Sequence, residues 1–166
     1  MYYKEAKEIA LYLKKHMRFD VPQKYDIEIV GSVAREEDKI KDIDFLIITD
    51  RKVPNILKKI YFDTDKITID HISDCGDRKC FVYLNNLKID LFYAVRKDEA
   101  FALLHHIGPK SYLLRIRRLA KSKGYLLNQY GIFHRDSGRR VSGKFDTVCD
   151  IQKFINISCR PPQKRR

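Results

Sequence analysis

The sequence predicts an α+β fold: a mixed β-sheet with flanking helices, followed by a smaller C-terminal α/β lobe. Two observations support this prediction. Between about residues 25 and 94, short apolar or alternating segments separated by turn residues are typical of β-strands. From about residue 97 onward, helical periodicity becomes more frequent. We therefore expect two parts, residues 1–96 and 97–166, in this chain of 166 residues.

The first part is expected to begin with a helix over residues 4–17, which Pro22 and its neighbours end. Residues 25–30 alternate polar and apolar side chains, as a half-buried strand does. Ser32 is then expected to cap a short helix. Residues 43–48 are apolar on both faces and therefore indicate a central strand.

A helix over residues 53–61 is expected next, with Pro54 near its first turn. The pair Asn85 and Asn86 predicts a tight hairpin turn. Three further strands are expected around this turn, at residues 66–72, 80–84 and 88–94.

The second part is expected to contain two helices separated by Gly108-Pro109, a hairpin, and a last helix that Thr147 caps. Gly124 is suited to end the second of these helices. The tail is basic and expected to be extended. The expected segments are helices 98–106 and 110–123, strands 125–128 and 131–134, a helix ending at 155, and a tail over 160–166.

The composition favours a polyanionic partner, most often nucleic acid. The chain has 34 basic and 22 acidic residues, a net charge of +12. The alternative is a basic protein with a solvated surface and no such partner. No long uncharged apolar run is present, so no membrane span is expected. The first residues lack the apolar region of a signal peptide, so an intracellular location is the default. A monomer is also only the default.

Four cysteines are present, at positions 75, 80, 149 and 159, and their spacing does not match a paired zinc site. Cys75 and Cys80 flank a turn-like stretch between two expected strands. A hairpin there would bring their sulfurs within bonding range. The alternative is a pair of reduced thiols, which an intracellular location favours.

Three acids indicate a metal site. Asp42 and Asp44 stand at the start of an apolar strand and point to one face, where two close carboxylates require a proton or a cation. Asp90 lies within another mostly apolar strand, where an acid needs a partner. Three carboxylates on neighbouring strands suit two hard cations such as Mg²⁺, the arrangement used in phosphoryl transfer. Alternatively, Asp90 forms a salt bridge with Lys88 or Arg96.

Residues close to these acids suit a phosphate group. The turn at Gly31-Ser32 offers backbone N–H groups, and Arg35 follows one turn later, where it is able to grip a triphosphate. The alternatives are a simple turn with a cap, and a surface arginine paired with Glu36 or Asp38.

Taken together, the motifs resemble the family X DNA polymerases, within the nucleotidyltransferase superfamily. The resemblance rests on Gly31-Ser32-Val33-Ala34-Arg35, Asp42-Ile43-Asp44 and Ile89-Asp90-Leu91. It continues through residues 108–117, 127–133 and the Arg160-Pro161 tail, and so covers nearly the whole chain. It implies a catalytic palm over residues 1–96 and a fingers-like lobe for nucleotide and template over residues 97–166. Short viral members of the family imply the host cytoplasm or the virion as the location.

The resemblance also implies a reaction: template-directed addition of a dNTP to a primer 3′-hydroxyl, for short-gap filling in DNA repair. Two Mg²⁺ ions, replaceable by Mn²⁺, would be held by Asp42, Asp44 and Asp90. The partners would be gapped or primed duplex DNA and a dNTP. The nucleotide-binding residues implied are Gly31, Ser32, Arg35, His105, His106 and Gly108. The DNA-binding residues implied are Lys88, Arg115, Arg117, Arg118, Lys121 and Lys123.

The chain departs from the family pattern beside Gly108. His106 replaces an aromatic hydrocarbon and Ile107 replaces threonine, which leaves the discrimination between sugars open. Two other functions share the acidic motif. One is a nucleotidyltransferase that modifies tRNA, a protein or a small molecule, and the other is a catalytically inactive nucleic-acid-binding module.

Overall fold

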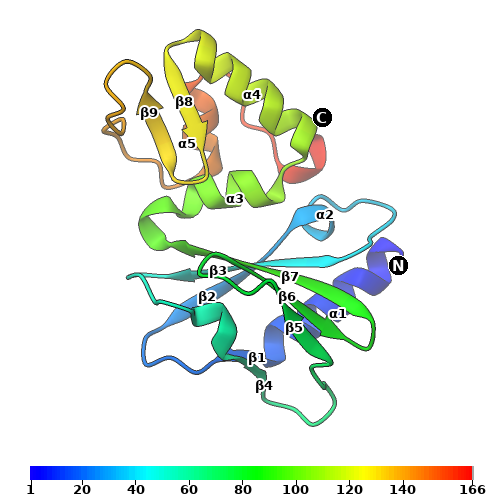
Figure 1. The fold of residues 1–166 in the computed structure, drawn as a ribbon. Coiled ribbons are helices and arrows are strands. Elements are labelled where there is room, and N and C mark those ends of the chain that lie inside the picture. Colours follow the sequence, from blue (N-terminus) through cyan, green and yellow to red (C-terminus); the bar gives the residue numbers. More distant parts are fainter. Residues whose placement is uncertain (166) are drawn as a thin grey trace. The chain divides into compact units, whose positions relative to one another are not determined.

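The computed structural model describes residues 1–165; Arg166, the last residue of the expected basic tail, lies outside the described residues. The chain divides into two compact units, Met1–Lys97 and Asp98–Arg166 (Figure 1). Each unit has its own cluster of buried apolar side chains. The structure confirms the predicted α+β class, with a mixed five-stranded sheet in the first unit.

The sheet of the first unit has the strand order β2-β3-β7-β6-β5. The strands β3 and β7, in the middle of the sheet, are long and apolar, which suits a position where another strand pairs on each side. β3 pairs with β2 in antiparallel and with β7 in parallel orientation. The strands are β2 (Tyr25–Val30), β3 (Ile43–Thr49), β5 (His71–Ser73), β6 (Lys79–Leu84) and β7 (Leu87–Val95).

The two faces of this sheet have different roles. Helix α1 (Tyr3–His16) buries Ala6, Ala10 and Leu13 in the same core cluster as alternate side chains of the sheet, such as Phe45 and Leu91. Because side chains alternate along a strand, the residues between them point to the opposite face. The acids of β3 and β7 therefore lie on the face away from this core.

The hairpin turn between β6 and β7 confirms the prediction for Asn85 and Asn86. Both residues are left-handed, with φ of 50° and 66°, and Leu84 pairs with Leu87 across the turn. Asparagine tolerates this conformation better than most residues, so the turn can connect two strands directly.

Several predictions for the first unit are wrong. Residues 53–61 form only a 3₁₀ turn, η1 (Ile56–Lys59), followed by the strand β4 (Ile60–Phe62). Left-handed Asn55 precedes the turn, and β4 pairs with β1 (Met17–Phe19), which the sequence did not indicate. Here long-range strand pairing overrides the local helical pattern.

The expected strand over 66–72 is also shorter, since only His71–Ser73 forms β5 against β6. Ser32 does not cap a helix. It lies inside the short helix α2 (Gly31–Ala34), whose N-cap is Val30.

The second unit packs helices on a hairpin. Its core includes Phe101 and Leu104 of α3, Tyr112 and Ile116 of α4, and Ile151 of α5. Thr147 and Asp150 form a reciprocal capping box, which confirms the predicted start of α5. The elements are α3 (Glu99–Ile107), α4 (Lys110–Ser122), β8 (Tyr125–Asn128), β9 (Gly131–His134) and α5 (Val148–Phe154).

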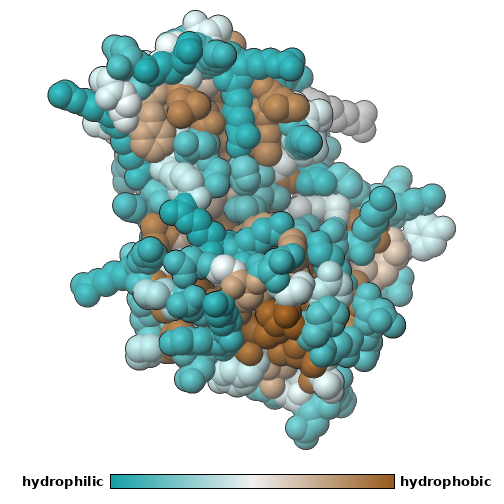
Figure 2. Space-filling model, in the orientation of Figure 1, coloured by the Kyte–Doolittle hydropathy of each residue, from teal (hydrophilic) through white to brown (hydrophobic). Residues whose placement is uncertain are grey.

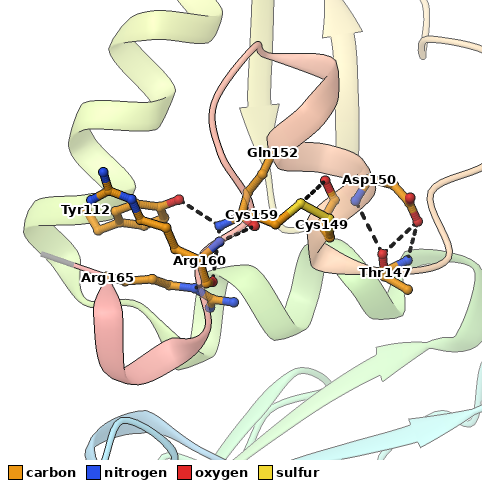
Figure 3. Close-up of a disulfide and its surroundings, with 8 residues drawn as sticks. All are labelled: Tyr112, Thr147, Cys149, Asp150, Gln152, Cys159, Arg160 and Arg165. Carbon is orange, nitrogen blue, oxygen red and sulfur yellow. Dashed lines mark hydrogen bonds between the residues drawn. A yellow bond between two sulfur atoms is a disulfide. The ribbon is translucent and has the colours of Figure 1, made fainter.

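The C-terminal segment is held against α4 and α5 by one buried amide (Figure 3). Nε2 of Gln152 donates to the hydroxyl of Tyr112 at 2.7 Å, and Oε1 accepts from the backbone N–H of Arg160 at 3.2 Å. The segment then forms a 3₁₀ turn, η3 (Pro162–Lys164), so the prediction of an extended tail is wrong. Nε of Arg165 donates to the carbonyl of Arg160 at 3.0 Å, which folds the end back on itself.

Two disulfides are formed. Cys75 forms a disulfide with Cys80 of β6, across the turn that leads into this strand. This disulfide is one of the two alternatives predicted for these cysteines. Cys149 of α5 pairs with Cys159, a bond the sequence did not indicate. Within residues 1–165, no helix has the length and apolar character needed to cross a bilayer.

Candidate active site

Strand pairing brings the three predicted acids together. Asp44 of β3 lies directly opposite Asp90 of β7 in the parallel register. Asp42 precedes β3 by one residue and lies on the same side as Asp44, because strand side chains alternate. The Nζ of Lys88 is 2.7 Å from Asp90 Oδ1 and 4.0 Å from Asp42 Oδ2, so these two carboxylates share one neighbour.

The acids are electrostatically costly as they stand. The pKa of Asp44 is raised to about 7, first by burial and then by the nearby carboxylates of Asp42 and Asp90. Arg35 and Lys88 oppose this rise. Burial likewise raises the pKa of Asp90, against the attraction of the Lys88 ammonium. A carboxyl group with a pKa near neutrality is poised to take up either a proton or a cation.

Lys88 is the cation that the chain itself supplies. Burial acts to lower its pKa, but the neighbouring groups, above all the carboxylates of Asp90 and Asp42, together outweigh burial and raise the pKa of Lys88 above its usual value. The Lys88 ammonium forms an ion pair with Asp90 Oδ1. Of the two predicted partners of Asp90, Lys88 is the one observed, and Arg96 instead pairs with Asp26 and Asp50.

The donor set suits a hard divalent cation. Three carboxylates project from neighbouring strand positions, and burial together with the other two raises the pKa of Asp44 to about 7. Within residues 1–165, no group of three acid, histidine or cysteine side chains is arranged to ligate one ion directly, and the Lys88 ammonium lies between Asp42 and Asp90. Displacement of the Lys88 ammonium would leave its place between the two carboxylates to a metal ion.

Gly31 forms one wall of the acid cluster. Its φ is +64°, and a Cβ on this residue would lie 1.9 Å from Oδ2 of Asp44. Only glycine therefore fits beside this carboxylate. The next residue, Ser32, has a buried hydroxyl oxygen without a hydrogen-bond partner in the described part of the chain. A buried hydroxyl in this state gains from a ligand that supplies the missing partner.

Arg35 lies at the end of α2 and pairs with Glu37, at 2.7 Å between Nη2 and Oε1. The alternatives considered from the sequence were Glu36 and Asp38, so the acid that pairs with Arg35 was not foreseen. Arg35 also lowers the pKa of Asp44 by its charge, which places the guanidinium within electrostatic reach of the acid cluster. The pair with Glu37 is partly exposed, and ion pairs of this kind contribute little to stability.

In the second unit, two predicted site residues bind each other. Nη2 of Arg117 donates to Nδ1 of His105 at 2.7 Å. Burial lowers the pKa of His105, and the charge of Arg117 lowers it further, which favours the neutral imidazole. The rings of His105 and His106 meet edge to face at 4.8 Å. Gly108 follows with a φ of +69° and ends α3.

The remaining predicted DNA-binding residues line one helix and its end. Arg115, Arg118, Lys121 and Lys123 are all exposed on or just after α4. The guanidinium of Arg115 lies 5.2 Å from the ring centroid of Tyr112, a cation–π contact that fixes its stem. Their contact with DNA stays a prediction.

The fold and the acid cluster define a nucleotidyltransferase. Residues 12–98 match the protein family described as "Nucleotidyltransferase domain", and residues 102–166 match the family described as "DNA polymerase beta thumb". The chain is 37% identical over 150 positions to a repair DNA polymerase X of African swine fever virus, covering 84% of this chain and 81% of that protein. This chain belongs to the family X DNA polymerases, as a relative of the viral repair polymerases.

Other comparisons agree. A second isolate of the same virus has a repair DNA polymerase X that is 33% identical over 178 aligned positions, covering 97% of both chains. The DNA polymerase/3′-5′ exonuclease PolX of Bacillus subtilis is 28% identical over 139 positions, covering 81% of this chain and 23% of that one. The polymerase beta of Leishmania infantum, solved in a ternary complex, has the same fold: the TM-score is 0.78 at 18% identity, over 100% of this chain and 76% of that one.

Proposed function

We propose that this chain fills short gaps in DNA by adding a dNTP to a primer 3′-hydroxyl under the direction of a template. The observation that carries the proposal is the convergence of Asp42, Asp44 and Asp90 on one face of the sheet, beside Gly31, where any larger residue would clash with Asp44. Family membership supports the reaction class, and the net charge of +12 supports a nucleic-acid partner.

Asp42, Asp44 and Asp90 are the residues we assign to two Mg²⁺ ions, with Mn²⁺ as a substitute. Bound divalent ions lower the pKa of a hydroxyl at such a site and offset the charge that develops on phosphate. The raised pKa of Asp44 supports this assignment, because a cation relieves the repulsion between the carboxylates. Lys88 moves from the acids toward the primer backbone when the ions bind.

The reaction exchanges one phosphate ester bond for another. The primer 3′-oxygen loses its proton and forms a bond to the α-phosphorus, while the bond from that phosphorus to the pyrophosphate oxygen breaks. We assign Asp90 to orient the hydroxyl and receive the proton; burial raises the pKa of Asp90, which supports a role as proton acceptor. Ser32 and Arg35 bind the β- and γ-phosphates, the first by its unpartnered hydroxyl and the second by exchange from Glu37.

The second unit is assigned to the nucleotide's sugar and base and to the template. His105 and His106, next to Gly108, present two imidazole faces to the nucleotide. Arg117 holds His105 in orientation and reaches the template strand near the new base pair. Exposed Arg115, Arg118, Lys121 and Lys123 bind DNA phosphates. We further propose that the protein acts as a monomer inside the infected or host cell.

A primer-extension assay tests the proposal. A labelled primer on a gapped duplex is incubated with Mg²⁺ and one or all four dNTPs. Wild-type protein extends the primer only with Mg²⁺ or Mn²⁺ and only with the complementary nucleotide. Asp90→Asn lowers the rate by about a thousandfold or more, while the surface control Asp20→Asn leaves it unchanged.

The same assay separates the rivals. Transfer of labelled AMP to tRNA or protein without primer extension would overturn the proposal in favour of another nucleotidyltransferase. DNA binding without any metal-dependent transfer would identify a catalytically inactive binding module.

A further inference from the structure

The sheet face that carries the acids continues across β6 to the edge of the sheet. Lys79, Phe81 and Tyr83 of β6 lie on one face, because side chains alternate along a strand. The register pairs Phe81 with Asp90 of β7, which puts these three on the face of the acids. Beyond β6, it pairs Tyr83 with His71 of β5. We call Lys79, Phe81, Tyr83 and His71 the β6 strip.

The rings of the β6 strip are ordered by contacts with each other and with cations. His71 and Tyr83 stack at 4.2 Å with an angle of 10° between the rings. The Nζ atoms of Lys79 and Lys88 each lie 4.1 Å from the ring centroid of Phe81. Side chains that are already held in one orientation lose little freedom when they bind a ligand.

Core packing does not account for this strip. The alternate β6 residues Cys80, Val82 and Leu84 belong to the buried cluster of the first unit, whereas the rings of the strip belong to neither cluster within residues 1–165. His71 and Lys79 are exposed, and Phe81 and Tyr83 are partly exposed. Aromatic rings interleaved with cations on a solvent-facing sheet are the combination that binds a strand of nucleic acid.

The distance between the β6 strip and Asp90 indicates which DNA strand the strip would contact. Neighbouring strands of a sheet lie about 4.8 Å apart, so β6 and β5 lie about 5 and 10 Å from Asp90 on β7. Nucleotides along one DNA strand advance by about 3.4 Å. The β6 strip therefore spans roughly two or three nucleotides, measured outward from the residue that meets the reacting hydroxyl.

We propose that the β6 strip binds the primer strand directly upstream of its 3′ end. Lys79 pairs with a backbone phosphate, and the rings of Tyr83 and His71 pack on the sugars of the preceding nucleotides. Charge complementarity supports this occupant, since Lys79 and Lys88 both face the strip and the strand carries one negative charge per nucleotide. The inference rests on the proposed function, because the position of the primer end defines the direction of the strand.

The test measures affinity apart from chemistry. The primer ends in a 3′-dideoxynucleotide and carries a fluorophore, and binding of the primed template is followed by anisotropy with Mg²⁺ present. The double variant His71→Ala/Tyr83→Ala raises the Kd by about tenfold or more. Tyr83→Phe, which keeps the ring, leaves the Kd near that of the wild type. Tyr61→Ala is the matched control, because Tyr61 is an exposed tyrosine on β4, outside the five-stranded sheet.

Three results would overturn the inference: an unchanged Kd in the double variant, an equal loss in Tyr61→Ala, or an equal loss of affinity for the unprimed single-stranded template. Thermal unfolding of each variant excludes global misfolding as the cause. If the wild type failed to extend primers, the proposed function would fall, while a selective loss of primed-DNA affinity would still support the strip.

Discussion

Gly31 is the residue where a single atom decides whether the site can form. A Cβ would lie 1.9 Å from Oδ2 of Asp44, and the φ of +64° disfavours any other residue. Gly31→Ala must therefore displace the Asp44 carboxylate. We expect the variant to lose about a hundredfold or more in kcat/KM for dNTP incorporation, measured by single-nucleotide extension.

Gly138→Ala is the control for this substitution. Gly138 has nearly the same φ, +66°, but among residues 1–165 nothing lies within 4 Å of an added Cβ. Both variants should lose about 1 kcal/mol of stability from backbone strain. Only Gly31→Ala should lose activity. Equal activity in the two variants would show that Asp44 does not need its present position.

Asp44 makes the stability of the metal-free protein depend on pH. Its pKa is raised from 3.8 to about 7, so the folded state binds this proton more tightly than the unfolded state. Stability is then highest below the unfolded value and falls as pH rises toward the folded value. The loss is about 4 kcal/mol at most, since one pKa unit corresponds to about 1.4 kcal/mol.

Urea unfolding in EDTA at pH 5, 6, 7 and 8 measures this slope. Asp44→Asn should flatten it, because the amide does not titrate. Mg²⁺ should bind more tightly as pH rises through 7, since the proton competes with the metal. A wild-type stability that rises from pH 5 to 7, with the same slope in Asp44→Asn, would contradict the assigned role of burial at this carboxyl group.

At the scale of elements, one side chain of α5 holds the C-terminal segment of the second unit in place. Gln152 is 1% exposed and bonds the hydroxyl of Tyr112 and the backbone of Arg160. The Cys149–Cys159 disulfide joins the same two segments covalently (Figure 3). The segment is thus fastened by a covalent bond and a polar bond at neighbouring positions.

Gln152→Ala leaves a buried hydroxyl and a backbone N–H without partners. We expect a loss of about 2–4 kcal/mol in the free energy of unfolding, measured by chemical denaturation. Lys153→Ala, on the exposed side of the same helix, should change stability by less than about 0.5 kcal/mol. Similar losses in both variants would mean that the amide network contributes nothing beyond helix propensity.

At the scale of the whole molecule, charge governs the affinity for DNA. The net charge is +12, and hydrophilic side chains dominate the face seen in Figure 2, with apolar residues gathered in patches. If all six predicted DNA-binding residues reach phosphates, log Kobs should fall with log[salt] at a slope of about −5. Between 50 and 200 mM salt, affinity should therefore fall by about a thousandfold.

Titration of primed DNA at four salt concentrations checks this slope. Lys121→Glu/Lys123→Glu should make the slope shallower by about 2. Lys58→Glu/Lys59→Glu removes the same charge from exposed residues of η1, outside the predicted contacts, and should leave the slope nearly unchanged. A flat salt dependence in the wild type would contradict the assignment of these lysines and arginines.

Much of the local structure could be predicted from the sequence, because residues that are close together along the chain determine it. The hairpin turn at Asn85-Asn86, the capping box at Thr147 and the strand at residues 25–30 agree with prediction. The segment 53–61 did not follow, because its last residues pair with β1, some forty positions away. Local propensity cannot contain that information.

The sequence by itself determined which acids are the candidates for the site, because alternation within a strand and the family motif depend only on residue order. The tertiary structure alone decided their surroundings: Lys88 between Asp42 and Asp90, Glu37 on Arg35, and His105 on Arg117. It also revealed the β6 strip, whose alternation was visible in sequence but whose exposed face was not. These contacts join segments far apart in the chain or choose among several nearby partners, so packing and charge in three dimensions settle them.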